Sequence, residues 1–97
     1  MKLVALYKQP LDAAAFDQYY TETHTPLVQK MPGLRQLKIT RFPRTLMGDG
    51  YYMMAEMYFD DRDALNQALR SPEGAATAGD LQNFAAGLCT LMIGQEE

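Results

Sequence analysis

The most constraining feature of this sequence is the run of residues 51–59, which is largely apolar on both sides. Its composition and its period-two alternation predict a β-strand. The two faces of that strand carry Tyr51, Met53, Ala55, Met57 and Phe59 on one side, and Tyr52, Met54, Glu56 and Tyr58 on the other. A sheet built on such a strand needs cover on both faces, because large exposed apolar patches mark interfaces.

The other apolar patterns predict the remaining elements of one domain over residues 1–97. We expect strands at 2–8, 34–42, 51–59 and 88–94, a helix over 12–31 with or without a break at His24–Pro26, and helices capped by Asp60 or Asp61 and by Ser71. The order β-α-β-β-α-β is that of a ferredoxin-like α+β domain with a four-stranded antiparallel sheet. Strand 2–8 is apolar on both faces and is expected at the centre of the sheet.

Helices on one face of this sheet would leave the other face apolar and uncovered. We therefore predict a homodimer in which two sheets pack face to face about a two-fold axis and enclose a cavity. A chain of about 100 residues buries only one modest core, so a second copy is expected to wall any ligand pocket.

Charge and composition argue against several classes of function. A net charge of −3 with scattered lysines and arginines argues against nucleic-acid binding. No apolar run reaches the roughly 18 residues of a membrane span, and the N-terminus does not resemble a secretory signal. A single cysteine, Cys89, excludes an internal disulfide and fits the cytoplasm. One histidine and one cysteine are too few to predict a metal site.

His24 is the only histidine and therefore the first candidate for proton chemistry near neutral pH. Helical spacing from Phe16 through Tyr20 places it on the inward face of its helix. It is either a general acid or base at a pocket, assisted by a hydrogen bond from Tyr20 to a substrate oxygen, or a structural residue that bonds carbonyls freed near Pro26. Tyr20 has core packing as its alternative role.

Glu56 is the one charged residue within strand 51–59. Inside a cavity, burial would raise its pKa and suit it to proton transfer. At an edge or a dimer seam, it would instead pair with Arg41 or Lys38 on the neighbouring strand. Further candidates for substrate binding are Arg41 and the strand residues Tyr7, Tyr52, Met54 and Tyr58, with simple packing as the alternative role of the strand residues.

Several motifs of this chain resemble the EthD family. They are Tyr7-Lys8-x-Pro10, Phe16-x-x-Tyr19-Tyr20-x-x-x-His24-x-Pro26-Leu27, Gly33-Leu34, Ala55-Glu56-x-Tyr58-Phe59-Asp60, Ala64-Leu65, Ser71-Pro72-Glu73-Gly74, Asp80 and Phe84. The resemblance implies a dimeric α+β barrel with a small-molecule pocket, linked to bacterial degradation of ethyl tert-butyl ether beside a cytochrome P450 system. Wider relatives include dehydratases, cofactor-free monooxygenases, lactone isomerases and haem-binding enzymes, so the resemblance does not fix the reaction.

These observations favour a cytoplasmic homodimer that handles a small organic compound in oxidative degradation. We expect it to be either a cofactor-free enzyme with His24 as general acid or base, oxidoreductase-associated or of the lyase or isomerase type, or an auxiliary factor. Two alternatives stay open: a non-catalytic carrier or binding module for a hydrophobic metabolite, and a haem-binding barrel with His24 as axial ligand.

Overall fold

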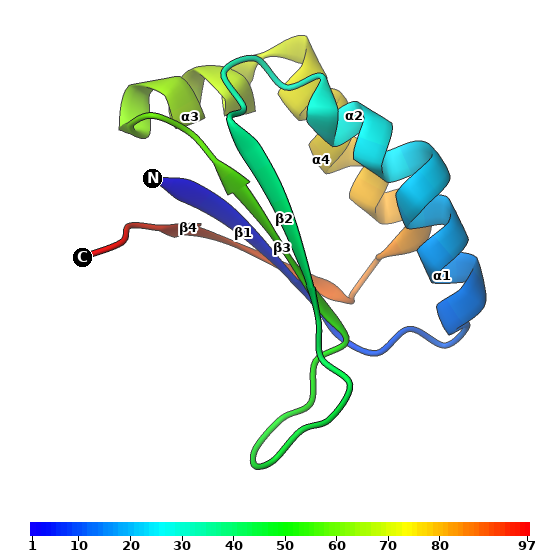
Figure 1. Cartoon of the computed structure of the whole chain (residues 1–97). Coiled ribbons are helices and arrows are strands. Elements are labelled where there is room, and N and C mark those ends of the chain that lie inside the picture. The colour runs from blue at the N-terminus through cyan, green and yellow to red at the C-terminus, as the bar shows by residue number, and fades with distance from the viewer.

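The computed structural model describes all 97 residues and contains a four-stranded sheet with helices (Figure 1). Neighbouring strands are antiparallel throughout, in the order β2-β3-β1-β4. This is the ferredoxin-like α+β architecture that the sequence predicts. In chain order the elements are β1 (Lys2–Tyr7), α1 (Ala13–Tyr19), the π-helix η1 (Tyr20–His24), α2 (Thr25–Gln29), β2 (Gln36–Arg41), β3 (Met53–Tyr58), α3 (Arg62–Arg70), α4 (Pro72–Phe84) and β4 (Cys89–Gly94).

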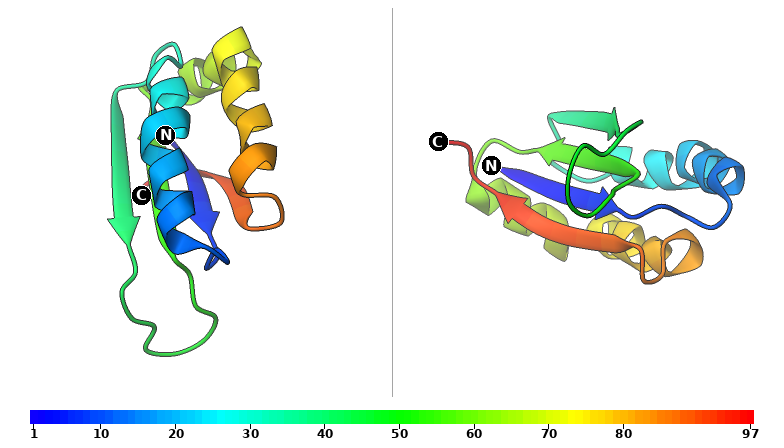
Figure 2. Two further views of the ribbon diagram at one scale, coloured as in Figure 1. Left: turned by 90° about the vertical axis from the view of Figure 1, so that its right-hand side faces the viewer. Right: turned by 90° about the horizontal axis from the view of Figure 1, so that it is seen from below.

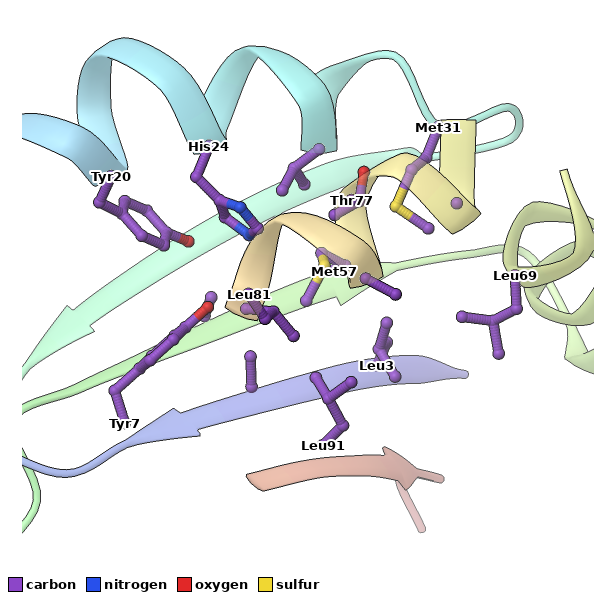
Figure 3. Close-up of a pocket in the computed structure, with 15 residues that line it drawn as sticks. Leu3, Tyr7, Tyr20, His24, Met31, Met57, Leu69, Thr77, Leu81 and Leu91 are labelled. Carbon is purple, nitrogen blue, oxygen red and sulfur yellow. The ribbon is translucent and has the colours of Figure 1, made fainter. Parts of the chain in front are cut away.

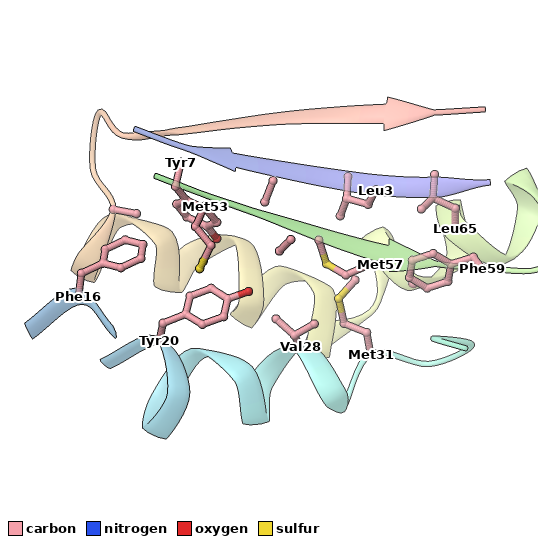
Figure 4. Close-up of a cluster of buried hydrophobic side chains, with 14 residues drawn as sticks. Leu3, Tyr7, Phe16, Tyr20, Val28, Met31, Met53, Met57, Phe59 and Leu65 are labelled. Atoms are coloured by element: carbon pink, nitrogen blue, oxygen red, sulfur yellow. The ribbon is translucent and has the colours of Figure 1, made fainter. Parts of the chain in front are cut away.

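The helices cover one face of the sheet, and the opposite face has no helix over it (Figure 2). Burial alternates along β1 and β3, because every second side chain points toward the helices. The core lies between the sheet and the helices (Figure 4). Its buried apolar side chains are Leu3, Ala5, Tyr7, Phe16, Tyr20, Val28, Met31, Met53, Ala55, Met57, Phe59, Leu65, Ala68 and Ala85.

The strand pattern correctly predicts the centre of the sheet. β1 lies between β3 and β4, and its half-buried residues on the open face include Val4 and Leu6. In β3, Met53, Ala55 and Met57 face the helices, whereas alternate residues face the open side. None of the helices is long and apolar enough to cross a membrane.

Side-chain caps fix where the helices begin. The carboxylate of Asp12 accepts a hydrogen bond from the Ala15 amide at 3.0 Å, and Asp61 caps α3 in the same way at 2.8 Å. Ser71 caps α4, which has proline at its first position. Each cap satisfies an amide that the first helical turn leaves free, which explains why these boundaries could be predicted.

The helix that carries His24 does not break before Pro26 but widens into a π-turn. The Thr25 amide donates to the Tyr20 carbonyl, five residues back, while the backbone remains helical into α2. Pro26 has no amide hydrogen and its ring crowds the preceding turn, so a wider turn relieves the conflict. The result keeps Tyr20 and His24 together on the buried face.

Candidate functional site

A cavity lies between the sheet and the helices, next to His24 (Figure 3). Its volume, measured as the space open to the centre of a water molecule, is about 40 Å³. The wall is almost entirely apolar, which means that only a few polar groups can orient a ligand inside. The lining residues are Leu3, Ala5, Tyr7, Tyr20, His24, Val28, Met31, Ala55, Met57, Leu69, Gly74, Thr77, Ala78, Leu81 and Leu91.

The position of this cavity corrects one expectation from the sequence. We expected a second copy to wall any ligand pocket, but the cavity beside His24 is walled by the sheet and helices of a single chain. The further cavity expected between two facing sheets stays a prediction. Its floor includes Ala5 and Ala55, which are directly paired in register across β1 and β3. Two alanines side by side leave space beneath the helices that larger residues would fill, so one small chain can contain a pocket.

The ring of His24 is held by a carboxylate from a distant part of the chain. Its Nδ1 lies 2.9 Å from Oδ2 of Asp80, which α4 brings against η1. Both residues are buried, with 3% and 7% of their surface exposed. The other carboxylate oxygen of Asp80 accepts hydrogen bonds from the hydroxyl of Tyr19 at 2.6 Å and from the amide of Asn83 at 3.0 Å. Asp80 is thus fixed on both sides.

The electrostatics of this pair favour a neutral imidazole beside an ionised carboxylate. Burial lowers the pKa of His24 below its ordinary 6.5, although the hydrogen bond to Asp80 acts in the opposite direction. Burial alone would raise the pKa of Asp80, but hydrogen bonds from Tyr19, Asn83 and His24 outweigh it and lower that pKa. A carboxylate only accepts hydrogen bonds, so Nδ1 carries the proton and Nε2 keeps its lone pair.

Tyr20 supplies a second polar group to the cavity. Its side chain enters from η1 one turn before His24, and the two rings lie 5.3 Å apart between centroids (Figure 3). The Tyr20 hydroxyl is buried and has no hydrogen-bond partner within the chain. Burial raises the pKa of this phenol, so it stays protonated and can donate. A buried hydroxyl without a partner costs stability, which makes a ligand oxygen its natural partner.

Replacing Tyr20 by phenylalanine is expected to leave the free energy of unfolding unchanged or to raise it by about 1 kcal/mol, because an unsatisfied buried hydroxyl disappears. Tyr19→Phe is the matched control in the adjacent position, and it should destabilise the fold because it removes a bond to Asp80. Urea unfolding of both variants checks this. A Tyr20→Phe variant that is clearly less stable than the natural protein would mean that the hydroxyl has a structural partner.

The structure brings only some of the predicted site residues to the cavity. Tyr7 lines it beside Tyr20, with ring centroids 5.9 Å apart. Glu56, Met54 and Tyr58 lie on the opposite face of the sheet, away from His24. The expected partner of Glu56 is also wrong: its carboxylate binds Lys2 on β1 at 2.7 Å, and this contact lowers the pKa of Glu56 instead of raising it.

Arg41 and Tyr52 form a separate cluster outside the cavity. Nη1 of Arg41 lies 2.6 Å from Oδ1 of Asp17, and the Tyr52 hydroxyl donates to the same carboxylate at 2.8 Å. These bonds tie β2 and the start of β3 to α1. Both side chains therefore have protein partners and hold the fold together at this edge.

Asp80 and Phe84 are site residues for which the sequence analysis predicts no role. Phe84 packs on the His24 ring at 4.7 Å between centroids. The sequence does contain a signal for Asp80. The charged residues of α4 are Glu73, in its first turn, and Asp80. Helical spacing puts Asp80 on one face with Thr77 and Phe84. A carboxylate on an inward face requires a partner, and His24 is the only histidine.

Fold and site together define a small ferredoxin-like protein with an apolar cavity and a buried histidine–aspartate pair. The sequence profile of the EthD domain matches residues 8–87, and this chain belongs to the EthD family.

Two relatives resemble this chain over almost its whole length. It is 52% identical to an EthD family protein of Bacillus halodurans, whose crystal structure superposes with a TM-score of 0.93 over 99% of this chain and 97% of that one. It is 36% identical to an uncharacterized 11.0 kDa protein encoded in the thcB–thcC intergenic region of Rhodococcus erythropolis, over 99% of this chain and 94% of the relative.

A more distant structure shares the fold alone. SnoaB, a cofactor-independent oxygenase from Streptomyces nogalater, is 20% identical and has a TM-score of 0.57 over 99% of this chain and 93% of that one.

Proposed function

We propose that this chain is an enzyme that moves a proton on a small, largely apolar organic molecule, with His24 as the general base. The observation that carries the proposal is the neutral His24 imidazole, fixed by Asp80 at the wall of an apolar cavity. Family membership supports a function on small molecules. The suggested substrate class is a neutral carbonyl compound, because its enolate needs a base and a hydrogen-bond donor.

In this mechanism Nε2 of His24 takes a proton from the carbon next to the substrate carbonyl. The C–H bond breaks and an N–H bond forms at His24. The C–H electron pair becomes a C=C bond, and the π pair of the C=O bond moves onto the carbonyl oxygen. The Tyr20 hydroxyl donates a hydrogen bond to that developing oxyanion. Asp80 stabilises the imidazolium and holds the ring in the reactive tautomer. The proton then returns from His24 to the substrate at the same or another atom.

The proposed mechanism uses no cofactor, and the size of the cavity beside His24 favours a small molecule over haem. About 40 Å³ open to a water centre accommodates a few waters or a small organic molecule, whereas a porphyrin would force the helices away from the sheet. Carbonyl compounds are common products of oxidation, so an oxidising partner such as a cytochrome P450 system remains part of the proposal.

Exchange of carbon-bound hydrogen tests the function without knowledge of the natural substrate. Butanone in D₂O should exchange its α-hydrogens for deuterium faster in the presence of the protein, as followed by proton NMR. The rate should saturate with butanone and be inhibited by other small ketones. Saturable binding with no acceleration of exchange would instead support the second candidate, a non-catalytic carrier, which the almost wholly apolar wall favours.

We also propose that the chain forms a homodimer through the open face of the sheet. This face carries half-buried Val4, Leu6 and Met54, and exposed Met92. Lys2 and Glu56 neutralise each other there, with the ammonium 2.7 Å from the carboxylate. An apolar surface with paired charges is suited to a second copy of itself.

Met92→Asp is expected to convert the dimer to a monomer, because it places an unpaired charge on the open face. Ile93→Asp is the matched control, because the neighbouring residue of the strand points to the other face. Sedimentation velocity measures the oligomeric state. A natural protein that sediments as a monomer at micromolar concentration would contradict the dimer.

A further inference from the structure

The cavity opens to solvent on one side, where its wall changes from buried to exposed residues. Leu69, at the end of α3, and Leu91, on the edge strand β4, both line the cavity and are 36% and 46% exposed. His24, Tyr20 and Tyr7 line its inner part and are 3% exposed or less. Figure 3 shows Leu69 and Leu91 away from the His24 side chain, across the cavity.

The packing of the helices explains why the opening is there. α4 packs mainly against α3, α2 and η1, and β4 has a strand neighbour on only one side. The space between the edge strand and the corner joining α3 to α4 is therefore closed only by side chains. Leu69 and Leu91 stand on the two sides of that space, and half-buried Leu81 from α4 also lines the cavity.

The chemistry of the opening is uniformly apolar. The residues that line the cavity include no carboxylate, ammonium or guanidinium group, and His24 is the only imidazole among them. A carboxylate or phosphate passing between two leucines would lose its hydration without gaining a partner, which is costly. A neutral molecule loses little, and its apolar part gains by leaving water.

We propose that Leu91 and Leu69 form the entrance through which a neutral, apolar ligand reaches His24, and that their size sets which ligand enters. This inference rests on the proposed function only for the role of His24 as the reacting group. What it adds is the route by which a ligand reaches the cavity. The exposed Ile93, two residues further along the same face of β4, lies outside the cavity lining. It extends the apolar surface without narrowing the passage.

The test uses the single histidine as its reporter. In an NMR titration, the ring signals of His24 need no assignment by mutation because no other histidine exists. Butanone and propanoate are the probes, since they have nearly the same shape but differ in charge. Butanone should shift the His24 signals saturably in the natural protein, and propanoate should leave them unchanged at equal concentration and constant pH.

Leu91→Trp should weaken butanone binding at least tenfold, because the larger side chain would occupy the end of the cavity that Leu91 lines. Ile93→Trp, the matched control, should bind butanone like the natural protein. Leu69→Trp approaches the same passage from the other side and replaces Leu91→Trp if that variant does not fold. Equal weakening by Ile93→Trp, or unchanged binding in both entrance variants, would overturn the proposed entrance.

The same titration separates this proposal from the enzymatic one. Butanone binding that is blocked at Leu91 while α-hydrogen exchange is absent would support the entrance and contradict the proton-transfer function. Propanoate binding as tight as butanone binding would overturn the neutral ligand class. If butanone causes no saturable shift of the His24 signals in the natural protein, the neutral ligand class is overturned as well.

Discussion

A His24→Gln variant is expected to lose the acceleration of butanone α-hydrogen exchange by about 10²- to 10⁴-fold, the usual contribution of a general base. Glutamine is close to histidine in size and its amide can donate to Asp80, so the buried carboxylate need not be left without a partner. It has no basic lone pair comparable to that of imidazole. The expected result is a folded protein that still binds butanone but no longer exchanges its hydrogen. Exchange at the natural rate in this variant would remove His24 from the mechanism.

The pH dependence of the natural protein gives a second test that requires no variant. The lowered pKa of His24 keeps the imidazole neutral somewhat below pH 6.5, and exchange should fall only as pH decreases through that lowered pKa. The histidine NMR signals report the same titration. The stability of the fold should change over the same range. Below about pH 6.5 the unfolded chain binds a proton at His24 that the folded chain does not, so the free energy of unfolding decreases as the pH falls toward the pKa of the folded state.

Asp80→Asn separates positioning from base strength. Asparagine can donate to Nδ1, which would place the proton on Nε2 and remove the lone pair from the cavity. The exchange rate should therefore fall toward that of His24→Gln, as in other sites where a histidine is held in the wrong tautomer. Nitrogen-15 chemical shifts of the ring report the tautomer directly. A normal tautomer with reduced exchange would contradict this role of Asp80.

Gly74→Ala is expected to lower the free energy of unfolding by about 3 kcal/mol or more, the range of severe steric defects. Gly74 lies in the first turn of α4, where its amide donates to the capping hydroxyl of Ser71 at 3.0 Å. A Cβ at this position would overlap the carbonyl oxygen of Ala68 and come within 3.1 Å of the Leu69 Cα. Backbone atoms cannot move aside as a flexible side chain can, so the corner joining α3 to α4 would have to separate.

Gly79→Ala is the matched control for this prediction. It lies in the same helix, and a Cβ there meets nothing within 4 Å. Alanine should therefore stabilise the helix by about 0.5–1 kcal/mol, because it restricts the unfolded chain. Urea unfolding measures both variants. Gly74→Ala with the stability of the natural protein would show that the corner tolerates a side chain.

Local patterns were enough to predict most of the fold. Alternation in 51–59 and the two apolar faces of 2–8 identified β3 and the central β1. The side chains of Asp12 and Ser71 predicted where α1 and α4 begin. These features depend on residues within a few positions of one another, so a single sequence contains the information. The π-turn was not predicted, because Pro26 indicated a conflict in the helix without indicating how the backbone would relieve it.

The site depended on contacts between distant residues. Spacing alone placed His24 and Tyr20 on one inward face, and the structure finds both at the cavity. By contrast, Asp80 is 56 positions from His24, and only the packing of α4 against η1 brings the two together. Glu56 was a candidate because alternation shows which residues share a face but not which face the helices cover.

The sequence by itself determined the order of elements, the helix caps and the presence of one titratable ring on a buried helix face. The tertiary structure decided that this ring is held by Asp80, that Tyr20 has a free hydroxyl, and that the cavity lies inside one chain above Ala5 and Ala55. The physical reason is that hydrogen bonding along a helix or strand is local and periodic. A cavity and a buried hydrogen-bond partner instead arise from how separate elements pack, which no short stretch of sequence specifies.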